Sequence, residues 1–184
     1  EGLGNKFLAN IRETDAIAHV VRCFDDENII HVHHKVDPIN DIDIINTELA
    51  LADLQTLENT KKRIAKSMKA GDKDAILLDS IVDRIASHLN NGNSLRTIEL
   101  SELDKVALKT LNLLTLKPVF YIANVKEDGF DNNPHLASLI DLASSEKSLV
   151  IPICNKIEAE IAEFSEIERN KLTFSVKTVS GIYF

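Results

Sequence analysis

A short apolar run that stops at polar residues constrains the fold of this sequence most. The segment Lys117–Phe130 reads K-P-V-F-Y-I-A-N-V-K-E-D-G-F, and its apolar residues 119–123 suit a strand covered on both faces of a parallel sheet. Polar groups just past the carboxyl end of such a strand lie where open α/β sheets bind ligands. Asn124 and Glu127 can therefore both contact one planar, hydrogen-bonding ligand such as a nucleobase. A strand that ends in an Asx-type turn explains the same pattern without a ligand.

Two further apolar runs predict neighbouring buried strands, at residues 16–24 and 149–154. The second is followed by a tight turn at Asn155 and Lys156 and by an amphipathic helix. This repeats the strand–loop–helix order of the first segment, so both loops should lie at the same edge of one sheet. The last twelve residues alternate like a strand but have no helix partner within the chain. The expected fold class is α/β with a parallel sheet.

Between residues 43 and 114 the apolar period changes to that of helices. Asp43 is a plausible first cap, Gly71 ends the first long helix, and Asp72 can cap a second that runs to about residue 90. A third helix starts at Ser101, with Asp104 in the capping-box position, and runs to Leu114. Two long amphipathic helices joined by a short turn must run antiparallel. We therefore expect a helical arm inserted between two strands of the α/β domain.

Composition limits the function classes. The chain has 184 residues, of which 44% are hydrophobic and 27% charged, so a sizeable core is feasible. No apolar run has membrane-spanning length, and no membrane partner is expected. Cys23 and Cys154 each lie near the end of an apolar run and resemble reduced thiols of a cytoplasmic protein. The net charge of −8 argues against a protein that coats nucleic acid over its whole surface.

The helical arm nevertheless carries a local cluster of positive charge. Six of the 21 Lys and Arg residues lie within residues 61–73, at Lys61, Lys62, Arg63, Lys66, Lys69 and Lys73. Such a cluster can bind phosphates. It is equally typical of a solvated helix end, where the helix dipole favours cations.

Histidines at 31, 33 and 34 offer a weak metal signal. Alternation would place His31 and His33 on one side of an extended segment. No further Cys or His stands nearby in the sequence to complete a tetrahedral site. No metal site is therefore expected among the residues of this chain.

Three long segments carry a resemblance to a known family. They are E-G-L-G-N-K-F-L-A-N-I-R-E-T-D-A-I-A-H-V-V-R-C-F, then V-D-P-I-N-D-I-D-I-I-N-T-E-L-A-L-A-D-L, then Y-I-A-N-V-K-E-D-G-F-D-N-N-P. Together they resemble YchF, the Obg-like family of ribosome-associated ATPases, over roughly residues 1–173. The resemblance implies a P-loop NTPase with a G-domain-like parallel sheet, an inserted coiled-coil arm and a following TGS domain. It also implies ribosome binding, and hydrolysis of ATP in preference to GTP with Mg²⁺.

The same resemblance suggests a division of the chain. Residues 1–40 and 115–173 would form a partial nucleotide-binding domain, residues 41–114 the arm, and residues 174–184 a tail leading into the TGS domain. The sequence contains no G-x-x-x-x-G-K-[ST] loop. Without it there are no backbone amides to cradle the phosphates and no hydroxyl for Mg²⁺. We expect the intact parent protein to be an ATP/GTP hydrolase, this chain alone to be inactive and without catalytic residues, and the Mg²⁺ ligands to precede it.

The resemblance also assigns the base-recognition residues. Guanine-specific relatives carry N-K-x-D where this chain has Asn124, Val125, Lys126 and Glu127. The longer Glu disturbs the two hydrogen bonds to guanine, and Val removes the Lys that packs along the base. A buried polar edge left unpaired costs about 1–3 kcal/mol, enough to erase a guanine preference and make adenine competitive.

Two further groups of residues take roles from the resemblance. The family's second base-contacting loop falls on Cys154, Asn155 and Lys156, which should act mostly through backbone groups. The arm tip, with Lys61, Lys62, Arg63, Lys66 and Lys69, becomes a candidate contact to ribosomal RNA. An alternative to the ATPase is therefore a non-catalytic ribosome- or RNA-binding module that acts through this arm.

Overall fold

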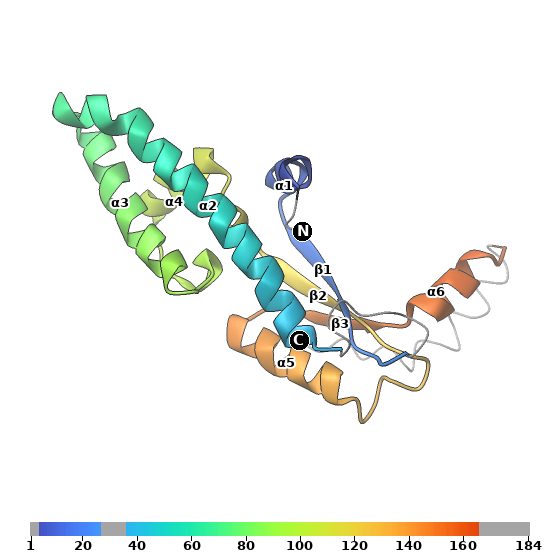
Figure 1. The fold of residues 1–184 in the computed structure, drawn as a ribbon. Helices are drawn as coiled ribbons and strands as arrows, with labels where there is room; N and C mark the ends of the chain where they lie inside the picture. The colour runs from blue at the N-terminus through green and yellow to red at the C-terminus, as the bar shows by residue number, and fades with distance from the viewer. Residues whose placement is uncertain (1–3, 27–35, 166–184) are drawn as a thin grey trace. The chain divides into compact units, whose positions relative to one another are not determined.

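A computed structural model describes residues 4–26 and 36–165 of the chain, which form two compact units (Figure 1). The first unit comprises residues 1–17 and 43–118, and the second comprises residues 18–42 and 119–184, as far as each is described. The α-helices are α1 (Asn5–Arg12), α2 (Pro38–Lys69), α3 (Lys73–Asn90), α4 (Glu102–Leu108), α5 (Pro134–Glu146) and α6 (Asn155–Ala162). The strands are β1 (Ile17–Arg22), β2 (Val119–Asn124) and β3 (Val150–Ile153), and short 3₁₀ helices occupy Leu95–Thr97, Lys109–Leu111 and Leu114–Leu116.

The second unit is built on a three-stranded sheet of order β1-β2-β3. Strands β2 and β3 are parallel, with Tyr121 opposite Val150 and Asn124 opposite Ile153. The amide of Cys23 donates to the Asn124 carbonyl at 2.8 Å, so the chain just past β1 stays beside the end of β2. Helix α5 packs on β2 and β3. The expected α/β fold with a parallel sheet is confirmed.

Burial of the strands differs from the expectation in one respect. Tyr121 and Ala123 are fully buried, but Phe120 and Ile122, which alternate with them, are only half-buried. In β1, Val21 is buried whereas Val20 is 57% exposed. The prediction that these strands are covered on both faces is wrong for the described residues. Their unbroken apolar sequence hides an alternation of buried and partly exposed positions.

The first unit contains the expected antiparallel arm, in which α2 and α3 run side by side (Figure 1). Gly71 joins them with φ +81°, a left-handed value that glycine adopts without strain. Asp72 caps α3 by accepting from the amides of Asp74 and Ala75. The core that these helices share comprises Leu57 of α2, Ile81, Val82, Ile85 and Leu89 of α3, and Leu95, Leu108, Leu111 and Leu113 of the following segment.

Two of the expected helix boundaries are wrong. Helix α2 begins at Pro38 rather than near Asp43, because the Asp37 carboxylate accepts from the Asn40 amide and proline fits a first helical turn. The third helix has the expected capping box at Ser101 but ends at Leu108.

The end of that third helix has a backbone cause. Asn112 adopts a left-handed φ of 47°, which stops the helical repeat before Leu114. Leu103, in the first turn of this helix, is 71% exposed although it is apolar.

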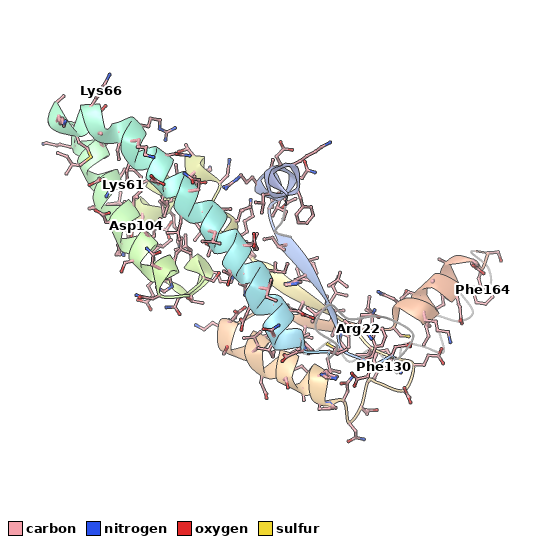
Figure 2. All side chains as sticks on the ribbon, viewed as in Figure 1. Arg22, Lys61, Lys66, Asp104, Phe130 and Phe164 are labelled. Carbon is pink, nitrogen blue, oxygen red and sulfur yellow. The ribbon has the colours of Figure 1, made fainter. Side chains whose placement is uncertain are left out.

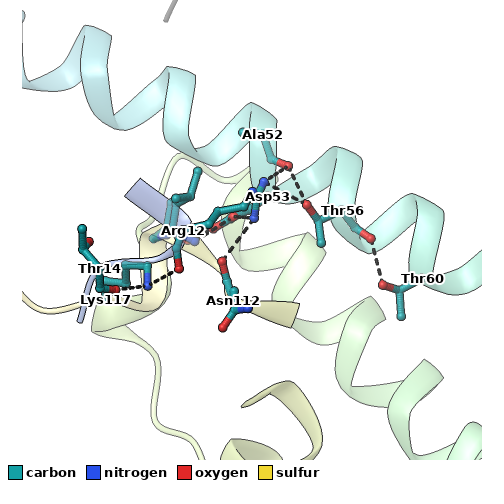
Figure 3. A network of polar contacts seen from close by, with 10 residues as sticks. Arg12, Thr14, Ala52, Asp53, Thr56, Thr60, Asn112 and Lys117 are labelled. Atoms are coloured by element: carbon teal, nitrogen blue, oxygen red, sulfur yellow. Dashed lines mark hydrogen bonds and ion pairs between the residues drawn. The ribbon is translucent and has the colours of Figure 1, made fainter. Parts of the chain in front are cut away.

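A buried carboxylate organises the base of the arm (Figure 3). Asp53 of α2 is inaccessible to solvent and accepts from the amides of Leu114 and Thr115 and from the Thr115 hydroxyl, at 2.7–2.9 Å. The Arg12 guanidinium at the end of α1 lies 3.7 Å from Asp53, and Lys117 donates to the carbonyls of Arg12 and Thr14. Three segments distant in sequence therefore meet at one side chain.

Several expectations lie outside the described residues. They concern the histidines at 31, 33 and 34 and the alternating tail beyond residue 173. No helix within residues 4–26 and 36–165 is long and apolar enough to cross a membrane. The division into a nucleotide-binding part and an arm at residues 40 and 115 remains a prediction.

Candidate functional site

A cavity of about 590 Å³ lies past the carboxyl ends of the strands in the second unit. Its lining residues are Phe24, Asp26, Asn124, Val125, Lys126, Glu127, Asp128, Cys154, Asn155 and Lys156. Among them are the six residues that the resemblance assigned to base binding, which are Asn124, Val125, Glu127, Cys154, Asn155 and Lys156. The loops after β2 and β3 meet here because parallel strands end at the same edge of a sheet.

Hydrogen bonds hold the two loops together. The Val125 amide donates to the Ile153 carbonyl at 2.8 Å, and the Asn155 amide donates to the Asn124 side-chain oxygen Oδ1 at 3.1 Å. With Oδ1 engaged, Asn124 keeps its Nδ2 group without a hydrogen-bond partner among the described residues. This amide can donate to an acceptor atom of a ligand in the cavity.

A second polar link fixes the loop after β2. The Asn133 side chain caps α5 through its oxygen, and its Nδ2 donates to the carbonyls of Cys23 and Gly129 at 2.8 and 2.9 Å. One amide thus joins the end of β1, the loop after β2 and the start of α5. The sequence signal for this role is an Asn directly before Pro134, at the first helical turn.

Two of the six predicted residues contribute little side-chain surface. Val125 is 2% exposed and its side chain belongs to the core around Tyr121, while Cys154 is 5% exposed. At position 125 a lysine could reach a base only by leaving this core. Val125 and Cys154 therefore line the cavity mainly with backbone.

Glu127 and Lys156 connect the loops by an ion pair, with 2.7 Å between Glu127 Oε1 and Lys156 Nζ. Their side chains are 54% and 71% exposed. The carboxylate of Glu127 raises the pKa of Lys156, and Glu160 one turn further along α6 adds to this effect. Lys156 therefore keeps its positive charge at neutral pH at the edge of the cavity.

Phe24 and Asp26 also line the cavity, although neither was predicted from the sequence. Phe24 is half-buried and lines the cavity, and the Arg22 guanidinium lies 4.8 Å from the centre of its ring. The sequence contains a signal for Phe24, since this residue closes the apolar run of β1 at the same edge of the sheet. An aromatic ring at this place offers a surface for stacking a planar ligand.

The predicted RNA-contact residues divide into two groups on the arm. Lys61 of α2 forms ion pairs with α3, with its Nζ 2.5 Å from Asp83 and 3.5 Å from Asp79. Lys62 pairs with Glu58 of its own helix at 2.7 Å. Asp83 accordingly raises the pKa of Lys61.

Arg63, Lys66 and Lys69 form the second group. Their side chains are exposed and make no ion pair or hydrogen bond within the described part of the chain. Lys66 lies near the end of the arm (Figure 2).

The described residues do not form a metal centre. No group of three or more His, Cys, Asp or Glu side chains in residues 4–26 and 36–165 could hold a metal ion. Among the described residues, the cavity therefore offers no ready-made protein site for the Mg²⁺ of a nucleoside triphosphate.

Comparisons with known proteins agree with the resemblance. No protein-family model matches the chain. The ribosome-binding ATPase YchF of Escherichia coli O157:H7 is 53% identical over 171 residues, which cover 93% of this chain and 47% of that protein. The protein of the same name from Bacillus subtilis (strain 168) is 45% identical over 172 residues, covering 92% and 47%.

A solved structure shows the same fold. The Schizosaccharomyces pombe YchF GTPase superposes with a TM-score of 0.81 at 32% identity, covering 97% of this chain and 50% of that one. The chain thus spans about half the length of the relatives it matches. On its sequence and its fold, this chain belongs to the YchF family.

Proposed function

We propose that the loops after β2 and β3 bind the base of ATP, and of GTP more weakly, in a ribosome-associated protein that hydrolyses these nucleotides. The cavity that unites Asn124, Glu127 and Lys156 carries this proposal. Hydrolysis with Mg²⁺, ribosome binding and a cytoplasmic location are proposed because the similar proteins are named ribosome-binding ATPases and a GTPase. The sequence contains no phosphate-binding loop motif, so we assign base recognition to its residues and no catalytic step.

The chemistry of the cavity suits a purine. The unpaired Nδ2 group of Asn124 can donate to the ring acceptor N7, which adenine and guanine share. The ring of Phe24 offers a stacking surface. Asn124 should therefore contribute affinity for both nucleotides, whereas the residues that face the variable edge of the base should set the preference.

Titration of the full-length protein with fluorescent analogues of ATP and GTP tests this assignment. Asn124→Ala should weaken both nucleotides by a similar factor of about ten, the value of one hydrogen bond at the upper end of its usual range. Glu127→Asp should shift the ratio of affinities toward GTP, because the shorter carboxylate matches the guanine-binding relatives.

The matched control is Asp141→Ala on α5, an exposed acid that does not line the cavity. It should leave both affinities as they are. If Asn124→Ala bound both nucleotides as tightly as the wild type, the base site would have to be elsewhere.

A second candidate function is RNA binding by the arm, with or without nucleotide. Arg63, Lys66 and Lys69 favour it, since they are exposed and unpaired among the described residues. No Asp or Glu occurs from residue 59 to residue 71, although Asp72 and Asp74 follow at the turn. Three cations on the outer side of a helix can contact successive phosphates of RNA.

Co-sedimentation of the full-length protein with ribosomes tests this function. Replacing Arg63, Lys66 and Lys69 by Gln should weaken binding by about tenfold near 0.1 M salt and flatten the salt dependence. The control replaces Lys6, Lys109 and Lys147, which are exposed and unpaired among the described residues, and should have little effect. Equal sedimentation of both triple variants would count against a role for the arm tip.

A further inference from the structure

Folding stability does not explain why Glu127 and Lys156 form an ion pair between these two loops. It joins two loops that are already connected by the Asn124–Asn155 and Val125–Ile153 hydrogen bonds. Both side chains are more than half exposed, and an exposed pair of this kind adds little to folding. Both residues line the cavity of about 590 Å³, so their polar atoms are available to a ligand there.

The two side chains offer different hydrogen-bonding groups next to each other. A carboxylate only accepts, and an ammonium group only donates. Adenine presents a matching edge, with a donor at its 6-amino group beside an acceptor at N1. Guanine presents the reverse order, an acceptor at O6 followed by donors at N1 and N2.

We propose that Lys156 acts with Glu127 as one donor–acceptor pair that selects adenine over guanine. Glu127 accepts from the 6-amino group, and Lys156 donates to N1. Asn124 donates to N7 and thereby sets the orientation of the base relative to the ion pair. Without Lys156, the carboxylate would present two acceptors, the arrangement that suits the two donors of guanine. This role deepens the proposed function and rests on it.

Lys156→Met tests the role, since methionine keeps the length of the side chain and removes the donor. In the full-length protein, the ratio of ATP affinity to GTP affinity should fall by about tenfold, mainly through weaker ATP binding. Lys126→Met is the comparison variant, because Lys126 lines the same cavity but makes no ion pair among the described residues. We expect Lys126→Met to change the ATP and GTP affinities by the same factor, as a general attraction between a lysine and a nucleotide would.

A charge exchange sharpens the test. Glu127→Lys combined with Lys156→Glu keeps the ion pair but reverses the order of donor and acceptor, so GTP should become the preferred nucleotide. A ratio unchanged in Lys156→Met, or an exchange variant that still prefers ATP, would overturn the role of Lys156.

The two proposals fail in different ways. If Asn124→Ala weakens both nucleotides while Lys156→Met leaves their ratio unchanged, only the selection by Lys156 is lost. If Asn124→Ala weakens neither nucleotide, the base site itself is wrong.

Discussion

Two carboxylates of this chain each face a cation, and their surroundings give them opposite roles. Asp53 at the base of the arm is fully buried and accepts three hydrogen bonds in addition to the Arg12 contact. Glu127 is half-exposed, and among the described residues its only polar partner is Lys156. A buried carboxylate must be satisfied by the protein itself, since no water replaces a lost partner. An exposed pair can exchange partners for a ligand at little cost.

The difference separates structural charges from charges available for binding. The same contrast holds within the arm, where Lys61 pairs across two helices and Arg63, Lys66 and Lys69 make no ion pair among the described residues. Residue type and local sequence are nearly identical in the two groups. Only their surroundings distinguish them.

Asp53→Ala should give the largest effect on stability. It leaves the amides of Leu114 and Thr115 without their acceptor and removes the negative charge that faces the Arg12 guanidinium, which should cost about 3–5 kcal/mol in the free energy of unfolding. Urea denaturation measures this loss. The control Asp141→Ala removes an exposed carboxylate and should change the free energy of unfolding little. A similar loss in both variants would contradict the distinction between buried and exposed carboxylates.

Arg12→Met should cost less, about 2 kcal/mol, since Asp53 keeps its three other donors. The variant also loses hydrogen bonds from Arg12 to the Ala52 carbonyl and the Thr56 hydroxyl. Combined with Asp53→Ala, it should add much less than its own single effect, because the two side chains belong to one network. Full additivity in the double-mutant cycle would contradict the network.

Cys23 extends the comparison to a buried thiol beside the cavity. Burial raises the pKa of Cys23 to about 12, whereas an exposed thiol titrates near 8.5. The unfolded chain therefore releases this proton first, and stability falls as the pH rises from 8.5 toward 12. Between pH 8.5 and 9.5 the wild type should lose about 1 kcal/mol more than Cys23→Ala. Parallel stability curves for the two proteins would show that Cys23 titrates normally.

Lys156→Met should have the smallest effect on folding. Its melting temperature should match that of the wild type, because the side chain is exposed and the loops keep their backbone contacts. Any change in nucleotide preference then reflects binding. A marked drop in melting temperature would instead place this pair with Asp53 as a structural contact.

Much of the site could be predicted from sequence because it follows short-range patterns. Asn124 and Glu127 come directly after an apolar strand, and Asn155 and Lys156 follow the next one, so a parallel sheet had to bring them to one edge. Phe24 also closes an apolar run, but only the structure shows that this run ends beside the end of β2. The early start of α2 at Pro38 was missed because Asp37 competes with Asp43 as a cap, and both fit the local pattern.

The sequence by itself determined the α/β class, the antiparallel helical arm and the loops that form the cavity, since apolar period, caps and turn glycines act over a few residues. Only the tertiary structure decided which charged side chains have partners within the protein. The partners of Asp53, Lys61 and Glu127 lie between 18 and 62 residues away in the chain. Hydrogen bonds and ion pairs act over a few ångströms in space, and no sequence pattern measures that distance.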